Sequence, residues 1–189
     1  MTAAELILAY RIAPDQELSP DLSNVFKFNP IRGSDGRTMD ANLEIRTEIV
    51  EELLHDFSKL DIHLIRQLFS EEMKCELATQ QHDNLYQLCY YLYDIGDLQD
   101  IFIIYDAKFN AKNMDVGSML DREMITVGHE VDDVIMYVQE EFENNPKLRD
   151  QYPNILVALN GLKENPDYES AKAYSKFIKG YFFGHDNTE

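Results

Sequence analysis

The sequence predicts an all-α protein of layered antiparallel helix hairpins with an irregular N-terminal arm. Apolar residues recur at the i, i+3, i+4, i+7 spacing of amphipathic helices over most of the chain. Only 8 glycines and 6 prolines occur among 189 residues, too few turn formers for a fold of many short strands. Hydrophobic residues make up 44% of the chain, enough to bury a core.

Residues 1–40 are expected to form the irregular arm, packed on a helical body. The stretches APDQELSP and NPIRGSDGR gather Pro, Gly, Ser and Asp, which favour turns. Val25, Phe26 and Phe28 are expected to hold the arm against the body. Residues 41–189 are then expected to form a single helical domain.

Helices are expected to follow one another along the body. Asp61 is expected to cap the helix after it, and His82, Asp83 and Asn84 to open the next. The following list gives the expected helices with examples of their inward residues: 43–60 with Ile49, Val50 and Leu53; the helix after Asp61 with Ile65, Leu68 and Phe69; 85–95 with Leu85, Leu88 and Leu92; 130–143 with Val131, Val134 and Val138; 155–162 with Ile155 and Leu159; and 174–182 with Tyr174 and Ile178.

A Gly-Asp corner separates the helix over 85–95 from one that is apolar on nearly all sides. Gly96 ends the first helix, because glycine adopts the left-handed conformation at no steric cost, and Asp97 caps the second. So short a corner predicts antiparallel helices, and an all-apolar helix has neighbours on most sides. The candidate core residues of this central helix are Leu98, Ile101, Phe102 and Tyr105.

An internal match suggests a short solenoid-like array. A shift of about 33 residues, a period typical of helix-pair solenoids, places Asp97–Phe102 on Glu130–Ile135. Both segments read acid, apolar, any, acid, apolar, apolar. Amphipathic helices also match by chance, so a true repeat and a coincidence both stay open.

The segment Leu85–Tyr105 resembles one degenerate tetratricopeptide unit, which implies a helix hairpin of that kind. Alanine is usual at the positions of Ile101 and Lys108. We therefore expect a similar helix hairpin and not a member of that family. The residues that carry it are Leu85, Leu88, Cys89, Leu92, Gly96, Ile101 and Tyr105.

Residues 84–138 resemble uncharacterised bacterial all-helical proteins with a pattern close to G-D-x-x-D, I-W-x-A-K, N-F-D and L-D. This chain has tyrosine for the tryptophan, methionine for the phenylalanine, and two additional residues before the asparagine. The resemblance implies a helical fold and supplies no catalytic residue. The counterparts here are Gly96, Asp97, Asp100, Ile104, Tyr105, Ala107, Lys108, Asn113, Met114, Asp115, Leu120 and Asp121.

Polar residues around the end of this pattern could carry chemistry. His129 precedes Asp132 and Asp133 at the i+3 and i+4 spacing of metal ligands on a helix. The same aspartates favour a helix start electrostatically, and no second histidine lies at helical spacing, so we expect a cap and no metal. For the other polar residues of this region, the alternative is that they only form loops and helix caps. The candidate polar cluster comprises Lys108, Asn113, Asp115, Asp121, His129, Asp132 and Asp133.

We expect no enzyme activity and no cofactor. Cys75 and Cys89 lie on apolar helix stretches, where a thiol acts as a small hydrophobic group. A nucleophilic cysteine needs electropositive surroundings, and this chain is acidic. The GSDG stretch at Gly33 lacks the Gly-Lys-Ser/Thr of a phosphate-binding loop. An enzyme with a site built from the Asp and His positions of the candidate cluster is an alternative.

The charge of the chain points to a class of partner. The formal net charge is −18, from 35 acidic and 17 basic residues. Such a surface repels nucleic acid and anionic membranes and attracts basic proteins, although acidity can also serve solubility alone. Two cysteines, no signal-peptide pattern and no apolar run of ~20 residues predict a cytoplasmic protein without a membrane partner.

The leading functional prediction is a non-enzymatic acidic protein that binds a basic protein partner. Its specific form is a bacterial immunity or antitoxin-type inhibitor, for which the partner is a basic toxin that the acidic surface attracts. A helical-repeat adaptor or regulator, which also acts by binding, is the alternative.

Overall fold

The structure is a computed structural model, which describes residues 1–12, 19–80, 84–110 and 114–184. Within these ranges it has eleven α-helices and one two-stranded antiparallel sheet, so the prediction of an all-α fold is confirmed. The chain divides into two compact units: unit 1 is residues 1–92 with 111–119, and unit 2 is residues 93–110 with 120–189. No helix in the described ranges is both long and apolar enough to cross a membrane.

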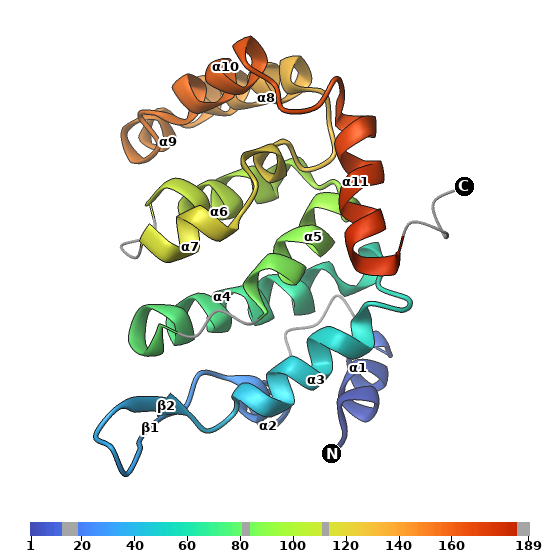
Figure 1. Cartoon of the computed structure of the whole chain (residues 1–189), viewed down its shortest axis with the longest axis vertical. Coiled ribbons are helices and arrows are strands. Elements are labelled where there is room, and N and C mark those ends of the chain that lie inside the picture. The colour runs from blue at the N-terminus through green and yellow to red at the C-terminus, as the bar shows by residue number, and fades with distance from the viewer. Residues whose placement is uncertain (13–18, 81–83, 111–113, 185–189) are drawn as a thin grey trace. The chain divides into compact units, whose positions relative to one another are not determined.

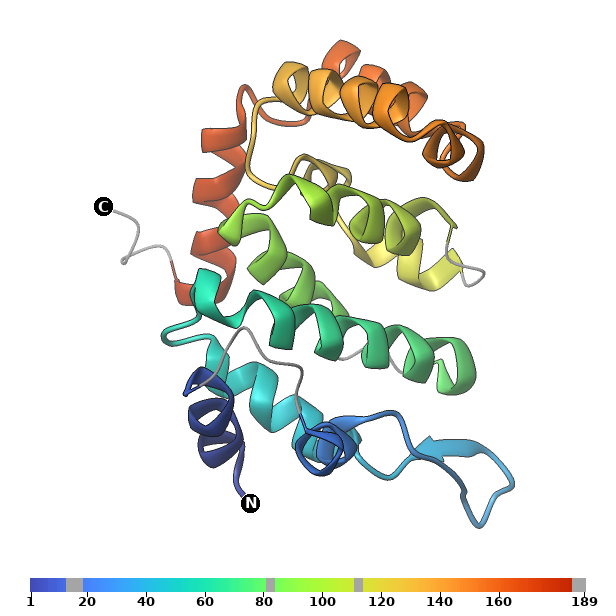
Figure 2. The same cartoon turned by 180° about the vertical axis from the view of Figure 1, so that it is seen from behind.

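Unit 1 is built around helix α3, which contacts α1 and α2, while α4 contacts strand β2 (Figures 1 and 2). The inward stripe of α3 is the predicted one, since Ile49, Val50 and Leu53 are buried. The elements of unit 1 are α1 (Ala3–Arg11), α2 (Pro20–Phe26), β1 (Pro30–Arg32), β2 (Thr38–Asp40), α3 (Leu43–Leu53), the 3-10 turn η1 (Lys59–Asp61), α4 (Ile62–Thr79), most of α5 (Leu85–Ile95) and α7 (Met114–Met119).

The arm predicted to be irregular contains regular structure, which corrects that expectation. Ser19 caps α2 by accepting from the Leu22 amide, and Pro20 occupies the first turn. Serine and proline mark helix starts as well as turns, so their presence alone did not exclude a helix. Strands β1 and β2 then pair antiparallel, with Ile31 opposite Met39. Residues 13–18 of the predicted arm lie outside the described residues.

Asp61 and the end of α3 also differ from expectation. Helix α3 ends at Leu53 instead of continuing to residue 60. The Asp61 side chain does not cap α4; it accepts hydrogen bonds from the Ser58 amide at 2.9 Å and from Arg11 Nε at 2.8 Å. Ser58 and Asp61 together close the turn η1, and this capping box interrupts the predicted helix.

A buried ion network joins four elements of unit 1. Arg46 is fully buried, and its Nε donates to Glu72 Oε2 and its Nη2 to Asp40 Oδ2, both at 2.6 Å. Its Nη1 donates to the Phe26 carbonyl oxygen at 3.1 Å. Asn84 Nδ2 donates to Glu72 Oε2 at 3.3 Å. Residues of α2, β2, α3 and α4 therefore meet at the Arg46 guanidinium. Asn84, directly before α5, bonds the Glu72 carboxylate of this network.

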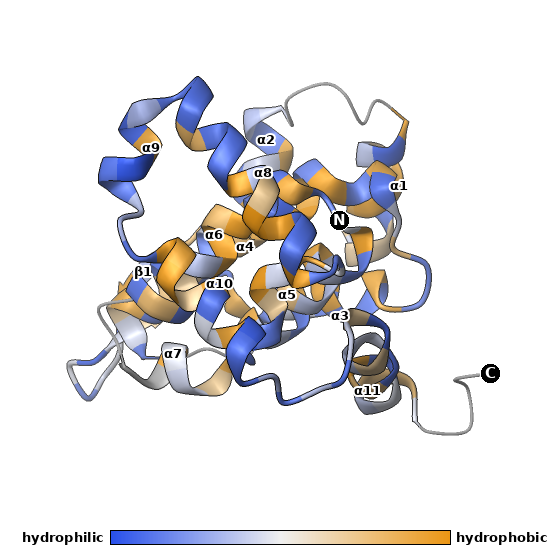
Figure 3. Cartoon of the chain, turned by 90° about the horizontal axis from the view of Figure 1, so that it is seen from above, coloured by the Kyte–Doolittle hydropathy of each residue, from blue (hydrophilic) through white to orange (hydrophobic). Residues whose placement is uncertain are grey.

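Helices α8 and α10 of unit 2 pack against each other, and α11 runs crosswise to them (Figures 1 and 2). Val134 and Val138 of α8 and Ile155 and Leu159 of α10 form buried stripes. Helix α9 is mostly hydrophilic (Figure 3), and none of its residues is buried. The elements are η2 (Leu98–Asp100), α6 (Ile101–Tyr105), the π turn η3 (Asp106–Asn110), the 3-10 turn η4 (Arg122–Thr126), α8 (Val131–Asn144), α9 (Pro146–Gln151), α10 (Ile155–Glu164) and α11 (Ala171–Phe183).

The predicted central helix is a composite of η2, α6 and η3. Of its candidate core residues, Ile101 and Tyr105 are buried, whereas Leu98 and Phe102 are partly exposed. Ile104 is buried instead. Within α6 the buried residues Ile101, Ile104 and Tyr105 keep i, i+3, i+4 spacing, so the inward face is an α-helical stripe that is turned away from Leu98 and Phe102.

We expect Ile101→Ala to destabilise the protein by about 2 to 5 kcal/mol, because it removes atoms from a fully buried site. Phe102→Ala should cost only about 1 to 2 kcal/mol, since the ring packs on Tyr152 at 4.9 Å between centroids but is partly in water. Urea unfolding of the two variants measures both losses. A larger loss for Phe102→Ala than for Ile101→Ala would contradict this assignment of the core.

Candidate functional site

Two tight turns, one before η2 and one before α8, meet in unit 2. Gly96 and Gly128 both have positive φ, +75° and +78°. As predicted, Gly96 ends α5, and Asp97 begins the next turn by accepting from the Gln99 amide at 3.1 Å. His129 Nε2 lies 2.9 Å from the Gly96 carbonyl oxygen. A carbonyl oxygen only accepts, so Nε2 carries the hydrogen and donates it.

The turn before α8 is under strain. Val127 is fully buried and has φ +42°, a conformation that β-branched residues rarely adopt. An ideal Cβ on the next residue, Gly128, would lie 2.8 Å from the Tyr93 carbonyl oxygen. Close packing therefore holds this turn in a conformation that costs free energy, and such strain gathers at functional sites.

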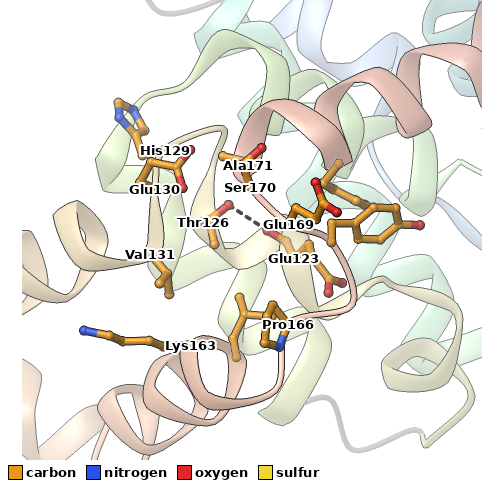
Figure 4. Close-up of a pocket in the computed structure, with 13 residues that line it drawn as sticks. Glu123, Thr126, His129, Glu130, Val131, Lys163, Pro166, Glu169, Ser170 and Ala171 are labelled. Atoms are coloured by element: carbon orange, nitrogen blue, oxygen red, sulfur yellow. Dashed lines mark hydrogen bonds between the residues drawn. The ribbon is translucent and has the colours of Figure 1, made fainter.

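A pocket of about 170 Å³ lies beside this turn, within unit 2 (Figure 4). Its walls come from η4, the start of α8, the end of α10 and the segment that leads into α11. Several lining residues at its edge are exposed, so the pocket reaches the surface. The charged and aromatic side chains that line it are Glu123, Glu130, Glu169, Lys163, Tyr168 and Tyr174.

Glu123 is the buried acid of this pocket. It is 8% exposed, and its Oε1 has no hydrogen-bond partner among the described residues. The nearest cation, Arg122 Nε, is 3.5 Å from Oε1, too far for a good hydrogen bond, and Arg122 donates instead to Asp167 Oδ2 at 2.9 Å and to the Asn165 carbonyl oxygen. Figure 4 shows the Glu123 carboxylate directed toward the segment that carries Pro166.

Burial raises the pKa of Glu123. A hydrogen bond from its own backbone amide opposes this, as does the charge of Arg122, while the carboxylates of Asp167 and Asp121 raise the pKa further. A buried carboxylate with an unsatisfied oxygen destabilises a fold unless something completes its bonding. Such a residue in a pocket is a candidate for function.

Aromatic rings form another wall of the pocket. Tyr168 and Tyr174 are in a T-shaped contact, with ring centroids 5.1 Å apart. The Tyr174 hydroxyl donates to Asp121 Oδ2 at 2.9 Å, and Tyr93 stacks edge-on against Tyr174. The hydroxyl of Tyr93 in turn donates to the Ala171 carbonyl oxygen at 3.1 Å. These contacts fix the rings beside the acidic wall.

Lys108 and Asp121 of the predicted polar cluster lie near this pocket, and a third member, His129, lines it. Lys108 Nζ donates to the Leu120 carbonyl oxygen at 2.6 Å. Burial lowers the pKa of Lys108, while Asp121 and Glu123 act in the opposite direction. The charges of Asp121 and Glu123 therefore act on Lys108, and Glu123 is a residue that the sequence did not single out.

The other members of the predicted cluster are not assembled with Lys108. His129 lines the pocket but is bonded to Gly96, whereas Asp132 and Asp133 are exposed on α8. Asp132 accepts from Lys163 Nζ at 2.5 Å. Among the residues that the structure describes, no group of three His, Cys, Asp or Glu side chains is placed to hold a metal ion. Asn113 lies outside the described residues, as does the side chain of Asp115.

Sequence reasoning missed Glu123, Tyr168 and Glu169. Glu123 has one local signal: it is an acid that directly precedes the apolar residues Met124 and Ile125, all three of which are buried. Tyr174 was assigned to the inward face of the last helix, and it is buried there as well as lining the pocket. The segments that form the pocket are far apart in the chain, so their convergence carried no signal in sequence.

Comparison of the chain with protein-family models, with curated proteins and with solved structures gives no match. The resemblances to the tetratricopeptide hairpin and to the bacterial all-helical proteins therefore stay predictions.

Glu123→Gln should raise the free energy of unfolding at pH 7 by on the order of 1 kcal/mol, because it removes a buried charge that lacks a full set of partners. The pKa of Glu123 is raised in the folded state, so ionisation penalises folding once the pH exceeds the ordinary value of 4.5 for this side chain. Below that value both states are protonated and the penalty is absent. The stability difference between variant and wild type, measured by urea unfolding, should shrink toward zero at pH 4. A destabilised variant at pH 7 would contradict this account.

Proposed function

We propose that this protein is a non-enzymatic binding protein whose partner is a basic protein. The observation that carries the proposal is the outer face of α8, defined by Asp132, Asp133, Met136, Glu140 and Glu143. These residues follow i, i+3, i+4 spacing and so lie on one side of the helix. Met136 is 65% exposed, and the four carboxylates are exposed around it.

The outer face of α8 has the composition of an interface for a basic partner. Every residue of α8 is described, and none of them is basic. An apolar side chain ringed by charges matches the usual arrangement of an interface, in which apolar anchors carry affinity and rim charges steer association.

The specific form that we propose is an immunity or antitoxin-type inhibitor of a basic toxin. Small acidic proteins suit this task, because a negative field speeds encounter with a positively charged target. A toxin gene directly upstream in the native host, and loss of that toxin's activity on addition of this protein, would support this form over an adaptor. Full toxin activity in a saturated complex would contradict it.

The proposal predicts that association depends on salt. Proteins captured from the native host at low ionic strength should include a basic one, and the purified pair should associate at least about tenfold more slowly in 0.5 M than in 0.05 M salt, with a smaller change in the off-rate. Surface plasmon resonance measures both rates. Salt-independent association would contradict the proposal.

A matched pair of variants locates the surface. Changing Asp132, Asp133, Glu140 and Glu143 to their amides removes four charges from α8. Changing Glu44, Glu48, Glu51 and Glu52 to glutamine removes four exposed charges from α3 in unit 1. The two variants have the same net charge. We expect the on-rate to fall mainly in the α8 variant, and equal on-rates would show that only total charge matters.

A further inference from the structure

We propose that the Glu123 pocket is an arginine-binding site, into which the basic partner inserts one arginine side chain. This inference rests on the proposed function and names the group that would anchor the partner in unit 2. Four features carry it: the incomplete bonding of Glu123, the excess of carboxylates in the lining, the tyrosine wall, and the position of the pocket beside the outer face of α8.

The incomplete bonding of Glu123 indicates a missing hydrogen-bond donor. The side chain is 8% exposed and lines the pocket, and its Oε1 accepts no hydrogen bond from the described residues, the nearest cation being Arg122 Nε at 3.5 Å. A buried carboxylate in a native structure normally has such a partner. A donor that enters the pocket would supply it, and a positively charged donor would also remove the cost of the buried charge.

The rest of the lining favours a cation over a neutral donor. Glu130 and Glu169 add two carboxylates, and Lys163 is the single ammonium among the lining residues, all of which are described. The Lys163 ammonium already forms an ion pair with Asp132. An anion would therefore meet three carboxylates, whereas a cation is attracted by all of them.

The tyrosine wall favours a guanidinium over an ammonium. Tyr168 and Tyr174 line the same pocket as Glu123. A guanidinium is planar, stacks on aromatic rings and donates two parallel hydrogen bonds to one carboxylate, whereas an ammonium is a compact and more strongly hydrated charge. A pocket of about 170 Å³ is small and suits a side chain better than a folded segment.

The position of the pocket favours a side chain from a protein over a free metabolite. Glu130 and Val131 line the pocket, and the outer face of α8 begins directly after them at Asp132. A basic protein docked on that face would have its nearby arginines within reach of the pocket. The pocket then acts as an anchor, and the carboxylates of α8 act as its rim.

The test uses a small probe, N-acetyl-arginine N-methylamide, which carries the arginine side chain without terminal charges. Titration into the full-length protein, followed by nuclear magnetic resonance, should give saturable shifts at residues that line the pocket. The isosteric, uncharged citrulline derivative should bind at least about tenfold more weakly, since it loses the charge-assisted hydrogen bonds. The lysine derivative should bind more weakly than the arginine one. Equal affinity for arginine and citrulline derivatives, or no saturable response to the arginine derivative, would overturn the proposal.

Glu123→Gln is the decisive variant, and it should weaken binding of the arginine probe at least about tenfold. This variant is expected to be no less stable than wild type, so unfolding would not explain the loss, and a thermal melt checks it. Glu51→Gln on α3 removes one exposed charge from unit 1 and serves as the matched control, with unchanged affinity. If the arginine probe binds Glu123→Gln as tightly as it binds wild type, the assignment of the site is overturned.

Two further outcomes separate the pocket from the proposed function. If a basic partner binds in a salt-dependent way but ignores Glu123→Gln, the partner proposal stands and the anchor is wrong. If the arginine probe binds and no basic partner associates, the pocket stands as a cation site and the proposed function fails. If free arginine binds more tightly than the blocked probe, the inference that the arginine belongs to a protein is overturned.

Discussion

Replacing Arg46 with methionine should destabilise the protein by about 3 to 5 kcal/mol, because it leaves two buried carboxylates without their cation. Asp40 and Glu72 both have fully buried side chains, and each bonds Arg46 at 2.6 Å. Methionine fills part of the space but donates no hydrogen bond, so both carboxylates would keep their desolvation cost. Urea unfolding of variant and wild type measures the loss.

The pH dependence of the Arg46→Met variant follows from Asp40. Burial alone would raise the pKa of Asp40, but the amides of Asn29 and Asn42 and the Arg46 guanidinium outweigh it, and the pKa is lowered. The stability that this carboxylate contributes is therefore present above its unfolded pKa, about 3.9, and is lost as the pH falls through the folded value. The difference in free energy of unfolding between the variant and wild type should therefore become smaller below pH 4.

Arg37→Met is the matched control, because Arg37 forms an exposed pair with Asp35 in the loop between β1 and β2. Its Nε lies 3.4 Å from Asp35 Oδ2, and its side chain is 86% exposed. Exposed pairs of this kind contribute little, so a loss below about 0.5 kcal/mol is expected. A loss for Arg46→Met as small as that of the control would show that the buried network does not stabilise unit 1.

The Arg46 network also shows what the sequence pattern could and could not predict. Arg46 stands three and four residues before Ile49 and Val50, so it lies on the apolar stripe of α3. Glu72 likewise follows Leu68 and Phe69 on the stripe of α4. A charged residue on an apolar stripe is a signal of a buried pair. Its partner could not be inferred, because Arg46 and Glu72 come together only in the tertiary fold.

Local signals predicted the turns of unit 2 well. Gly96 adopts positive φ, Asp97 caps the following turn, and α8 ends at Asn144 before Pro146, as the sequence indicated. Each of these features depends on neighbouring residues alone. The irregular helix at 98–110 depends on packing from several elements, so the α-helical periodicity assigned Leu98 and Phe102 to the core when both are partly exposed.

Local signals were weakest at the pocket. The predicted cluster included Lys108 and Asp121, whose charges interact, and also Asp132 and Asp133, which face solvent on α8. Glu123 was overlooked because an acid next to Arg122 at the start of an apolar run is common. Its burial, its unsatisfied oxygen and the lysine and tyrosines near it follow from contacts between distant segments.

Gly128→Ala should cost about 2 to 4 kcal/mol, the second large effect that we expect. Two terms contribute: φ is +78°, where a side chain is strained, and the new Cβ would lie 2.8 Å from the Tyr93 carbonyl oxygen. The obstacle is backbone, so a rotamer change cannot relieve it. The turn already contains Val127 in the left-handed conformation, and further displacement would move His129 from the Gly96 carbonyl oxygen.

Two other glycines provide the controls for this effect. Gly96→Ala has a similar φ, but its Cβ would meet only ordinary contacts at 3.5 and 3.6 Å, so a cost of about 1 kcal/mol is expected. Gly161→Ala lies within α10 with nothing inside 4 Å, and it should stabilise the protein by about 0.5 to 1 kcal/mol. Thermal and urea unfolding rank the three variants. If Gly128→Ala costs no more than Gly96→Ala, the close approach to Tyr93 does not constrain the turn, and the positions of His129 and Glu130 at the pocket would not depend on it.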